Sequence, residues 1–212
     1  MEQKKIHLQS KAQGHIKTSR LILLNLSLKP YFLKSKRIVI TGGPGTGKSS
    51  IMQQLEAEGA CCFHEISRQV TLDARKNGVE QLFLTDPIYF SQKLLEGRIR
   101  QFKEAENGTK PLVYFDRGIP DVKAYLDFSK TPCPPIFIEA GRQYRYDLVF
   151  MLPLWEEIYV CDNERYESYS QAGEIHHALV THYIELGYNL IEIPPGSVAN
   201  RAYFIINYLK PF

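Results

Sequence analysis

The feature that most constrains this chain is the stretch "RIVITGGPGTGKSSI" at residues 37–51, an apolar run followed by a glycine-rich turn and a helix-compatible segment. From Gly42 to Ser49 the turn satisfies G-x-x-x-x-G-K-[ST]. Glycines allow successive backbone N–H groups to point inward and form a nest for phosphate oxygens. The helix that follows directs the positive end of its dipole at the same anion. We predict that this segment binds a nucleoside triphosphate.

The residue types within this turn suggest how the nucleotide is held. The Lys48 side chain is long enough to reach the β- and γ-phosphates, and the Ser49 hydroxyl is a candidate ligand for Mg²⁺. We therefore expect ATP and Mg²⁺ as the cofactors. GTP stays an alternative, although the chain has no N-K-x-D guanine-reading motif. The predicted nucleotide-binding residues are Gly42, Gly43, Pro44, Gly45, Thr46, Gly47, Lys48, Ser49 and Ser50.

From residue 37 onward, short apolar runs alternate with helical patterns, which predicts an α/β domain with a parallel sheet. Together with the glycine-rich turn, this pattern predicts a P-loop NTPase of three α/β/α layers. Its mainly parallel sheet has five strands, and we expect the ligand beyond their carboxyl ends. The predicted strands are 37–41, 60–64, 111–115, 147–152 and 189–193. The predicted helices lie near 48–58, 66–77, 87–106, 119–128, 136–144, 171–187 and 197–209.

Charge divides the chain into two parts. Residues 1–37 carry nine Lys/Arg and one acid, whereas the remaining residues carry 17 Lys/Arg and 22 acids. We therefore expect a basic, poorly ordered N-terminal extension at 1–36 and one P-loop domain at 37–212. A basic arm on a membrane or nucleic acid and an organelle transit peptide are alternatives for the extension. The mildly acidic main domain is not expected to bind nucleic acid.

Apolar content and cysteine usage favour a cytoplasmic protein. No apolar run reaches the roughly 20 residues that span a bilayer. The four cysteines show no C-x-x-C pair, so we expect reduced thiols. No histidine has metal-ligand spacing with carboxylates on the ligand side, and we expect solvated or core histidines. Those considered are His64, His176, His177 and His182.

A second candidate element is an acid at a strand end, in "KPLVYFDRGIPDVKAYL" at 110–126. In P-loop proteins an acid at the position of Asp116 commonly holds Mg²⁺. ATP-hydrolysing machines usually follow it with a glutamate that polarises water, but here Arg117 follows. Arginine stabilises transferring phosphate but cannot activate water, so the pair favours transfer to a bound acceptor. The alternative is a surface ion pair or helix cap, and Asp121 is expected to be a first-turn acid that complements the helix dipole.

The third element, "HEISRQV", follows the strand at 60–64. Glu65 lies where the chain leaves the sheet on the ligand side, so its carboxylate is a candidate base for an attacking substrate hydroxyl. Arg68 is three residues later, on the same predicted helical face, and is a candidate contact to substrate or phosphate. The alternative is a capping acid with a surface i, i+3 pair.

The fourth element is a candidate lid, "FMLPLWEEIYVCDNERYESYSQA" at 150–172. Small-molecule kinases close such a segment over the phosphates and bring in an arginine that neutralises transition-state charge. Arg165 is the predicted lid arginine, with Arg142 and Arg145 as weaker choices. Each of these has an exposed charged residue as its alternative. Trp155 is a candidate for packing or for a substrate-stacking platform.

These stretches, together with "YRYDLVFMLPLWEEIY" and "LGYNLIEIP", resemble the AAA-type P-loop domain of the NadR and TRP-channel-trafficking kind. The resemblance covers 37–195, and "DRGIPD" followed by "LPLWEEIY" is its most specific part. Members of this family are described as predicted ATPases or kinases of NAD metabolism. Some relatives act instead as nucleotide- and phosphoinositide-binding trafficking factors.

The layout is more distantly similar to nucleoside and deoxynucleoside kinases, which implies a nucleoside-kinase-like P-loop NTPase. By that resemblance Glu65 corresponds to the base, Asp116 and Arg117 to the acid–Arg pair, and Arg165 to the lid arginine. Gly118 departs from the pattern, because those kinases usually have a small hydroxyl residue there. The nucleoside-binding side chains do not match, so the acceptor stays open; resemblance to NadR-type kinases implies nicotinamide riboside.

The leading hypothesis is a Mg-dependent kinase that transfers the γ-phosphate of ATP to a small, hydroxylated, nucleoside-like acceptor. The rival is a nucleotide-gated module that recruits a protein or an anionic membrane without phosphorylating an acceptor. The predicted catalytic residues are Lys48, Glu65, Asp116, Arg117 and Arg165. Substrate contacts are expected from Glu65, Arg68 and Trp155, and metal contacts from Ser49 and Asp116.

Overall fold

The computed structural model describes residues 35–159 and 167–210. Five parallel strands form one sheet in the order β2-β3-β1-β4-β5. Every strand predicted from the apolar runs is present, with each end within one residue of its expected position. The strands are β1 (Lys36–Gly42), β2 (Cys61–Phe63), β3 (Leu112–Asp116), β4 (Leu148–Leu152) and β5 (Leu190–Glu192).

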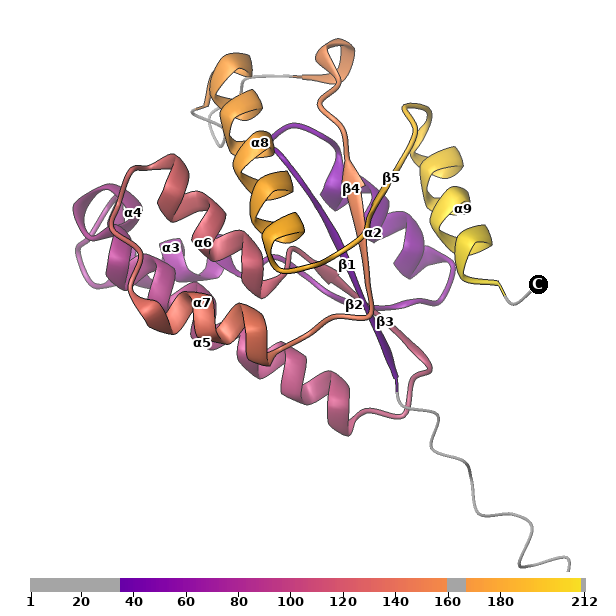
Figure 1. Cartoon of the computed structure of the whole chain (residues 1–212), viewed down its shortest axis with the longest axis horizontal. Coiled ribbons are helices and arrows are strands. Elements are labelled where there is room, and N and C mark those ends of the chain that lie inside the picture. The colour runs from indigo at the N-terminus through magenta and orange to yellow at the C-terminus, as the bar shows by residue number, and fades with distance from the viewer. Residues whose placement is uncertain (1–34, 160–166, 211–212) are drawn as a thin grey trace, which may run out of the picture. The chain divides into compact units, whose positions relative to one another are not determined.

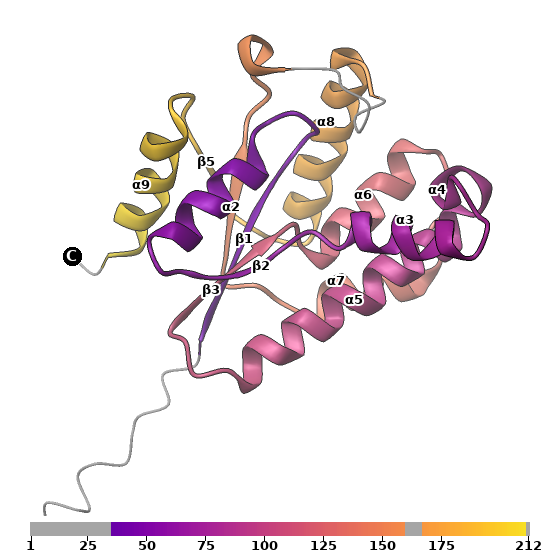
Figure 2. The ribbon, with the colours of Figure 1, turned by 180° about the vertical axis from the view of Figure 1, so that it is seen from behind.

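Helices cover both faces of the sheet (Figures 1 and 2). Helices α2 and α9 lie on one face, and α5, α6, α7 and α8 lie on the other. The seven predicted helices are present, and a short α4 and a 3₁₀ turn at Glu156–Ile158 are additional because they are too short for a helical period to show. The helices are α2 (Lys48–Ala57), α3 (Ser67–Lys76), α4 (Leu82–Thr85), α5 (Pro87–Asn107), α6 (Ile119–Phe128), α7 (Pro135–Gln143), α8 (Tyr169–Glu185) and α9 (Val198–Leu209).

Alternating residues of the central strand β1 feed two separate hydrophobic cores. Val39 packs with the helices α5 to α8, whereas Ile38 and Ile40 pack with α2 and α9. All three side chains are fully buried. Successive side chains of a strand point to opposite faces, so a strand buried on both faces reads as a continuous apolar run. The predicted three-layer α/β/α architecture is confirmed.

Local capping signals explain where several helices begin. The Asp86 side chain accepts a hydrogen bond from the Tyr89 N–H, and Pro87 occupies the first turn of α5. Ser168 and Gln171 exchange side chain–backbone hydrogen bonds at the start of α8. Such a capping box satisfies two otherwise unpaired N–H groups. It starts α8 at Tyr169, two residues before the predicted boundary.

The fold places the glycine-rich turn at the carboxyl end of the central strand, between β3 and β4. In open parallel sheets this is the edge where ligands bind, so the turn lies at the edge expected for a nucleotide site. Residues 1–34, which include nearly all of the predicted extension, lie outside the described residues. In the described ranges 35–159 and 167–210, every helix is too short or too polar to cross a membrane.

Candidate nucleotide and acceptor site

The turn from Gly42 to Gly47 has the geometry of an anion nest. Gly45 and Gly47 have φ values of 72° and 84°, the left-handed region that glycine enters without steric penalty. Within the described part of the chain, the backbone N–H groups of residues 45–48 donate no hydrogen bond to the protein. Helix α2 begins at Lys48, so its dipole adds to the same positive potential. The turn therefore presents a row of available donors to phosphate oxygens.

The Lys48 side chain is folded back onto this turn. Its Nζ donates to the carbonyl oxygens of Gly42 at 2.9 Å and Gly43 at 2.6 Å. Burial, and next the charge of Arg117, lower the pKa of Lys48 to about 7. Ser49 and Ser50 are exposed in the first turn of α2. Lys48 thus has weak charge compensation from the protein, and an anionic ligand would supply it.

Asp116 ends β3 directly beside the start of the turn, because its Cα pairs with that of Ile40 in β1. The residue is buried, and among the described residues its Oδ1 has no hydrogen-bond partner. Burial, and next the charge of Glu65, raise the pKa of the Asp116 carboxyl. An unpartnered buried carboxylate oxygen and an exposed serine hydroxyl are ligand types that suit a hard divalent cation. The donor set of Asp116 and Ser49 therefore fits Mg²⁺.

Glu65 lies at the same edge of the sheet and is bound by two arginines. Arg117 Nε is 2.6 Å from Oε2, and the Arg98 guanidinium donates to both carboxylate oxygens at 3.1 and 3.2 Å. Burial alone would raise the pKa of the Glu65 carboxyl, but Arg98 and Arg117 outweigh it and lower that pKa. Its Oε1 also accepts from the Ile66 and Ser67 N–H groups. The capping alternative is thus observed together with the predicted placement on the ligand side.

Arg117 occupies the space between the phosphate-binding turn and Glu65. Its side chain is only 12% exposed. Besides pairing with Glu65, its NH1 lies 3.4 Å from the Gly42 carbonyl oxygen and 3.3 Å from Asp121 Oδ1. Its φ of 72° is unusual for a residue with a side chain. The alternative of a surface ion pair is therefore wrong for Asp116 and Arg117.

Asp121 lies in the first turn of α6, as predicted, but its surroundings differ from those of an exposed capping acid. The side chain is fully buried and accepts hydrogen bonds from Thr41 Oγ1 at 2.6 Å and Tyr183 Oη at 2.6 Å. It also accepts from the Gly118 N–H at 2.9 Å. Gly118 has no room for a larger residue, because an added Cβ would lie 2.5 Å from Tyr183 Oη.

The predicted lid segment is described only in part, and Arg165 lies outside the described residues. Trp155 is half-buried, and its indole N–H donates to Glu157. The Tyr159 ring covers Gly45, where an added Cβ would approach it to 2.5 Å. The described start of the lid segment therefore reaches the phosphate-binding turn.

Arg68, the predicted substrate contact, is exposed in the first turn of α3.

The weaker lid candidates are at the wrong edge of the sheet. Arg142 and Arg145 precede β4, so they lie at its amino end, whereas the phosphate-binding turn lies at the carboxyl ends. Arg145 NH1 donates to the Leu186 carbonyl oxygen at 2.7 Å, and its guanidinium stacks on Tyr188. Both arginines are excluded as phosphate ligands, because strand direction separates them from the turn.

Two arginines that the sequence did not single out contact residues of the candidate site. Arg98 is buried against Glu65, and Arg201 in α9 donates from NH1 to the Thr46 carbonyl oxygen at 2.8 Å. The Arg201 guanidinium also lies 5.7 Å from the Trp155 ring centre. Helical periodicity could have identified both arginines, since each lies within the buried stripe of its helix. A charge inside an apolar stripe requires a buried partner.

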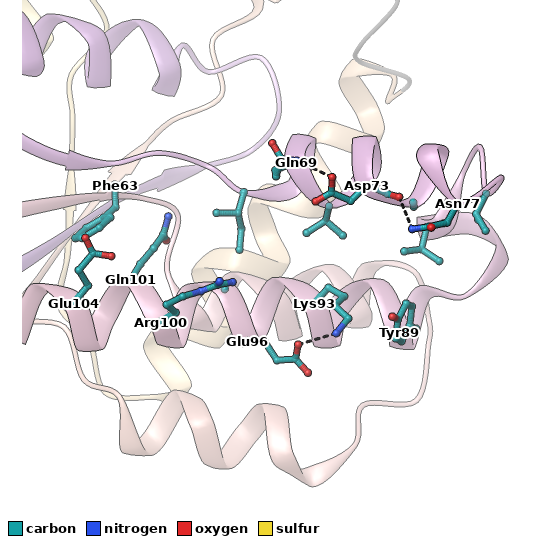
Figure 3. A pocket seen from close by; sticks show the side chains of 16 residues that line it. Phe63, Gln69, Asp73, Asn77, Tyr89, Lys93, Glu96, Arg100, Gln101 and Glu104 are labelled. Atoms are coloured by element: carbon teal, nitrogen blue, oxygen red, sulfur yellow. Dashed lines mark hydrogen bonds and ion pairs between the residues drawn. The ribbon is translucent and has the colours of Figure 1, made fainter.

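A separate cavity of about 760 Å³ lies between α3 and α5 (Figure 3). Its lining includes the apolar side chains of Ile66, Val70 and Leu82 and the charged side chains of Lys93 and Arg100. Ile66 follows Glu65, but the residues of the phosphate-binding turn do not line this cavity. The cavity is therefore distinct from the nucleotide site.

Comparison with known protein families places this chain in one of them. A family model described as an AAA domain matches residues 37–201. The chain belongs to this AAA domain family. The family resemblance inferred from the motifs is thereby confirmed. No curated protein matches this chain by sequence.

Solved structures similar to this AAA domain include kinases. NadR in complex with NR has 17% identity and a TM-score of 0.63, over 82% of this chain and 49% of that chain. Deoxyadenosine kinase from M. mycoides has 17% identity and a TM-score of 0.61, over 82% and 98%. Thymidylate kinase from Candida albicans has 12% identity and a TM-score of 0.61, over 83% and 91%. The chain thus spans about half the length of NadR, and the likeness shows a P-loop NTPase fold.

Proposed function

We propose that this protein is an ATP- and Mg²⁺-dependent kinase that phosphorylates a hydroxyl group of a small, nucleoside-like acceptor. The observation that carries the proposal is the contact between Glu65 and Arg117 beside the phosphate-binding turn. A carboxylate there is suited to hold an acceptor hydroxyl, and the guanidinium is suited to neutralise the transferring group. Because Arg117 directly follows Asp116, the position usual for a water-activating glutamate holds a cation, which disfavours hydrolysis.

In this proposal the nucleotide phosphates lie in the turn formed by residues 42–49. The N–H groups of residues 45–48 donate to phosphate oxygens, and Lys48 exchanges its carbonyl partners for the β- and γ-phosphates. Ser49 and Asp116 are the residues that would hold Mg²⁺, which would neutralise charge on those phosphates. Arg117 stabilises charge on the transferring group from the other side, and Arg165 from the lid segment does the same.

Glu65 orients the acceptor hydroxyl rather than acting as a strong base. A carboxylate with a lowered pKa accepts a hydrogen bond well but takes up a proton weakly. Phosphoryl transfer proceeds through a loose transition state in which positioning and charge stabilisation dominate, so this role is sufficient. Arg68 and Trp155 are proposed to contact the rest of the acceptor.

A nucleoside-like acceptor is supported by the similar solved structures. NadR was crystallised with NR, and deoxyadenosine kinase was solved with dCMP. These ligands belong to those proteins, and they define the first compounds to test here. Nicotinamide riboside and the common deoxynucleosides therefore form the starting panel.

The test is ADP formation from Mg·ATP by the full chain, alone and with each compound of the panel. We expect one acceptor to stimulate ADP formation strongly and Lys48→Ala to abolish that stimulation. Tight nucleotide binding without acceptor-dependent turnover across the panel would contradict a kinase of this substrate class. It would instead favour a nucleotide-gated binding module.

A further inference from the structure

We propose that Asp121 and Tyr183 are positioning residues that hold Arg117 between the phosphate-binding turn and Glu65. Through this pair, α8 sets the geometry of the acid–Arg element. The consequence for turnover rests on the proposed kinase function, whereas the positioning itself does not.

Asp121 gathers donors from three elements of the fold. Its Oδ1 accepts from Thr41 Oγ1 of β1 at 2.6 Å and lies 3.3 Å from Arg117 NH1. Its Oδ2 accepts from Tyr183 Oη of α8 at 2.6 Å and from the Gly118 N–H at 2.9 Å. The carboxylate is fully buried, so each of these contacts is shielded from water. Arg98 and Arg117 outweigh the effect of burial and lower the pKa of Asp121, which keeps it ionised.

The backbone at Arg117 needs such support. Its φ of 72° is a conformation that residues with side chains adopt only when the surrounding structure enforces it. The Arg117 N–H donates to the Ile40 carbonyl oxygen at 3.0 Å. Arg98 NH1 donates to the Gly118 carbonyl oxygen at 2.9 Å, while Asp121 accepts from the Gly118 N–H. The residue after Arg117 is therefore held at both its N–H and its carbonyl group.

Tyr183 connects this arrangement to the phosphate-binding turn through a single helix. Near its start, α8 lies against Gly43, since an added Cβ there would be 3.0 Å from the Ala172 carbonyl oxygen and 3.5 Å from His176 Cβ. Near its end, Tyr183 hydrogen-bonds to Asp121. A rigid helix that touches both places fixes the distance between the turn and the base of Arg117. Removal of the Tyr183 hydroxyl should therefore loosen Arg117 without changing the turn itself.

The experiment compares wild type, Tyr183→Phe and Asp121→Asn, with Tyr188→Phe as the matched control. Tyr188 Oη also makes a buried hydrogen bond, accepting from the Tyr146 N–H at 3.1 Å, and no hydrogen bond within the described residues joins it to Asp121 or Arg117. Phenylalanine at this position keeps the aromatic ring that packs against Tyr183. The readout is the solvent exchange rate of the Arg117 Nε–H in the NMR spectrum, assigned with Arg117→Lys. This proton reports on the contact with Glu65 and needs no substrate.

We expect Tyr183→Phe and Asp121→Asn to speed Arg117 Nε–H exchange at least about tenfold, with Tyr188→Phe close to wild type. In the kinase assay, Tyr183→Phe should lower kcat by about tenfold while the nucleotide Kd changes by less than about twofold, because misplacement affects transfer and not phosphate binding. Unchanged exchange in both variants would overturn the positioning role. Absence of turnover in wild type would overturn only the kinase proposal, since the exchange result stands without it.

Discussion

Arg117 Nε lies 2.6 Å from Glu65 Oε2, and this ion pair joins the end of β3 to the start of α3 at the ligand edge of the sheet. Arg98 completes the arrangement from α5 by binding both oxygens of the same carboxylate. Glu65 thus has a fixed position and a lowered pKa, which suits a group that orients a hydroxyl.

Glu65→Gln should keep the nucleotide affinity of wild type and lower turnover by at least about tenfold, because misplacement of the acceptor hydroxyl and of Arg117 slows the transfer step. The amide keeps the shape but removes the negative charge that Arg98 and Arg117 require. Nucleotide binding by fluorescence titration and ADP formation with the active acceptor measure the two effects separately. Turnover equal to that of wild type would remove Glu65 from the mechanism.

Nucleotide binding should take up a proton at alkaline pH. In the free protein the pKa of Lys48 is about 7, so at about pH 8 this amine is mostly neutral. Bound phosphates favour the charged amine and raise its pKa, so binding should take up roughly one proton, and affinity should fall as pH rises above 7. Calorimetry in buffers of different ionisation enthalpy counts the protons. The Lys48→Arg variant stays charged, so its nucleotide binding should take up no proton. Binding to wild type without proton uptake would contradict the prediction.

Gly118→Ala should destabilise the fold, and Tyr183→Phe should relieve part of that loss. An added Cβ would lie 2.5 Å from Tyr183 Oη and 3.1 Å from Val39 Cγ2. Overpacking of this kind typically costs about 1–3 kcal/mol. Denaturant unfolding of both single variants and the double variant gives the interaction free energy. Strictly additive effects would show that the Tyr183 hydroxyl does not limit the space at Gly118.

Arg201→Ala should weaken nucleotide binding several-fold, because it removes the hydrogen bond that holds the Thr46 carbonyl oxygen from α9. Arg145→Ala is a matched control, since Arg145 makes a similar bond to the Leu186 carbonyl oxygen away from the turn. A hydrogen bond from a charged group contributes about 1.5–3 kcal/mol to protein stability, and only the part that orders the turn should appear in the nucleotide affinity. Titration with a nonhydrolysable nucleotide, under conditions in which both variants are fully folded, compares their nucleotide affinities. Equal affinity in both would exclude Arg201 as a support for the turn.

Strand and helix positions could be predicted because they depend on patterns within short segments. The apolar runs marked all five strands to within one residue, and "GGPGTGKS" specified a phosphate-binding turn through glycine conformations that local sequence controls. The ends of β2 and β3 could also be placed on the ligand side, because parallel strands have one direction. That reasoning located Glu65, Asp116 and Arg117 at one edge.

The partners of those residues depended on the tertiary structure. Arg98 meets Glu65 across 33 positions of sequence, Tyr183 meets Asp121 across 62, and Arg201 meets Thr46 across 155. Helical periodicity shows that a residue faces inward but not which buried group it will meet, because helix packing sets that register. The sequence alone therefore determined the P-loop fold, the phosphate-binding turn and the residues at the ligand edge. Only the packing of α5, α8 and α9 against the sheet decided which side chains hold them in place.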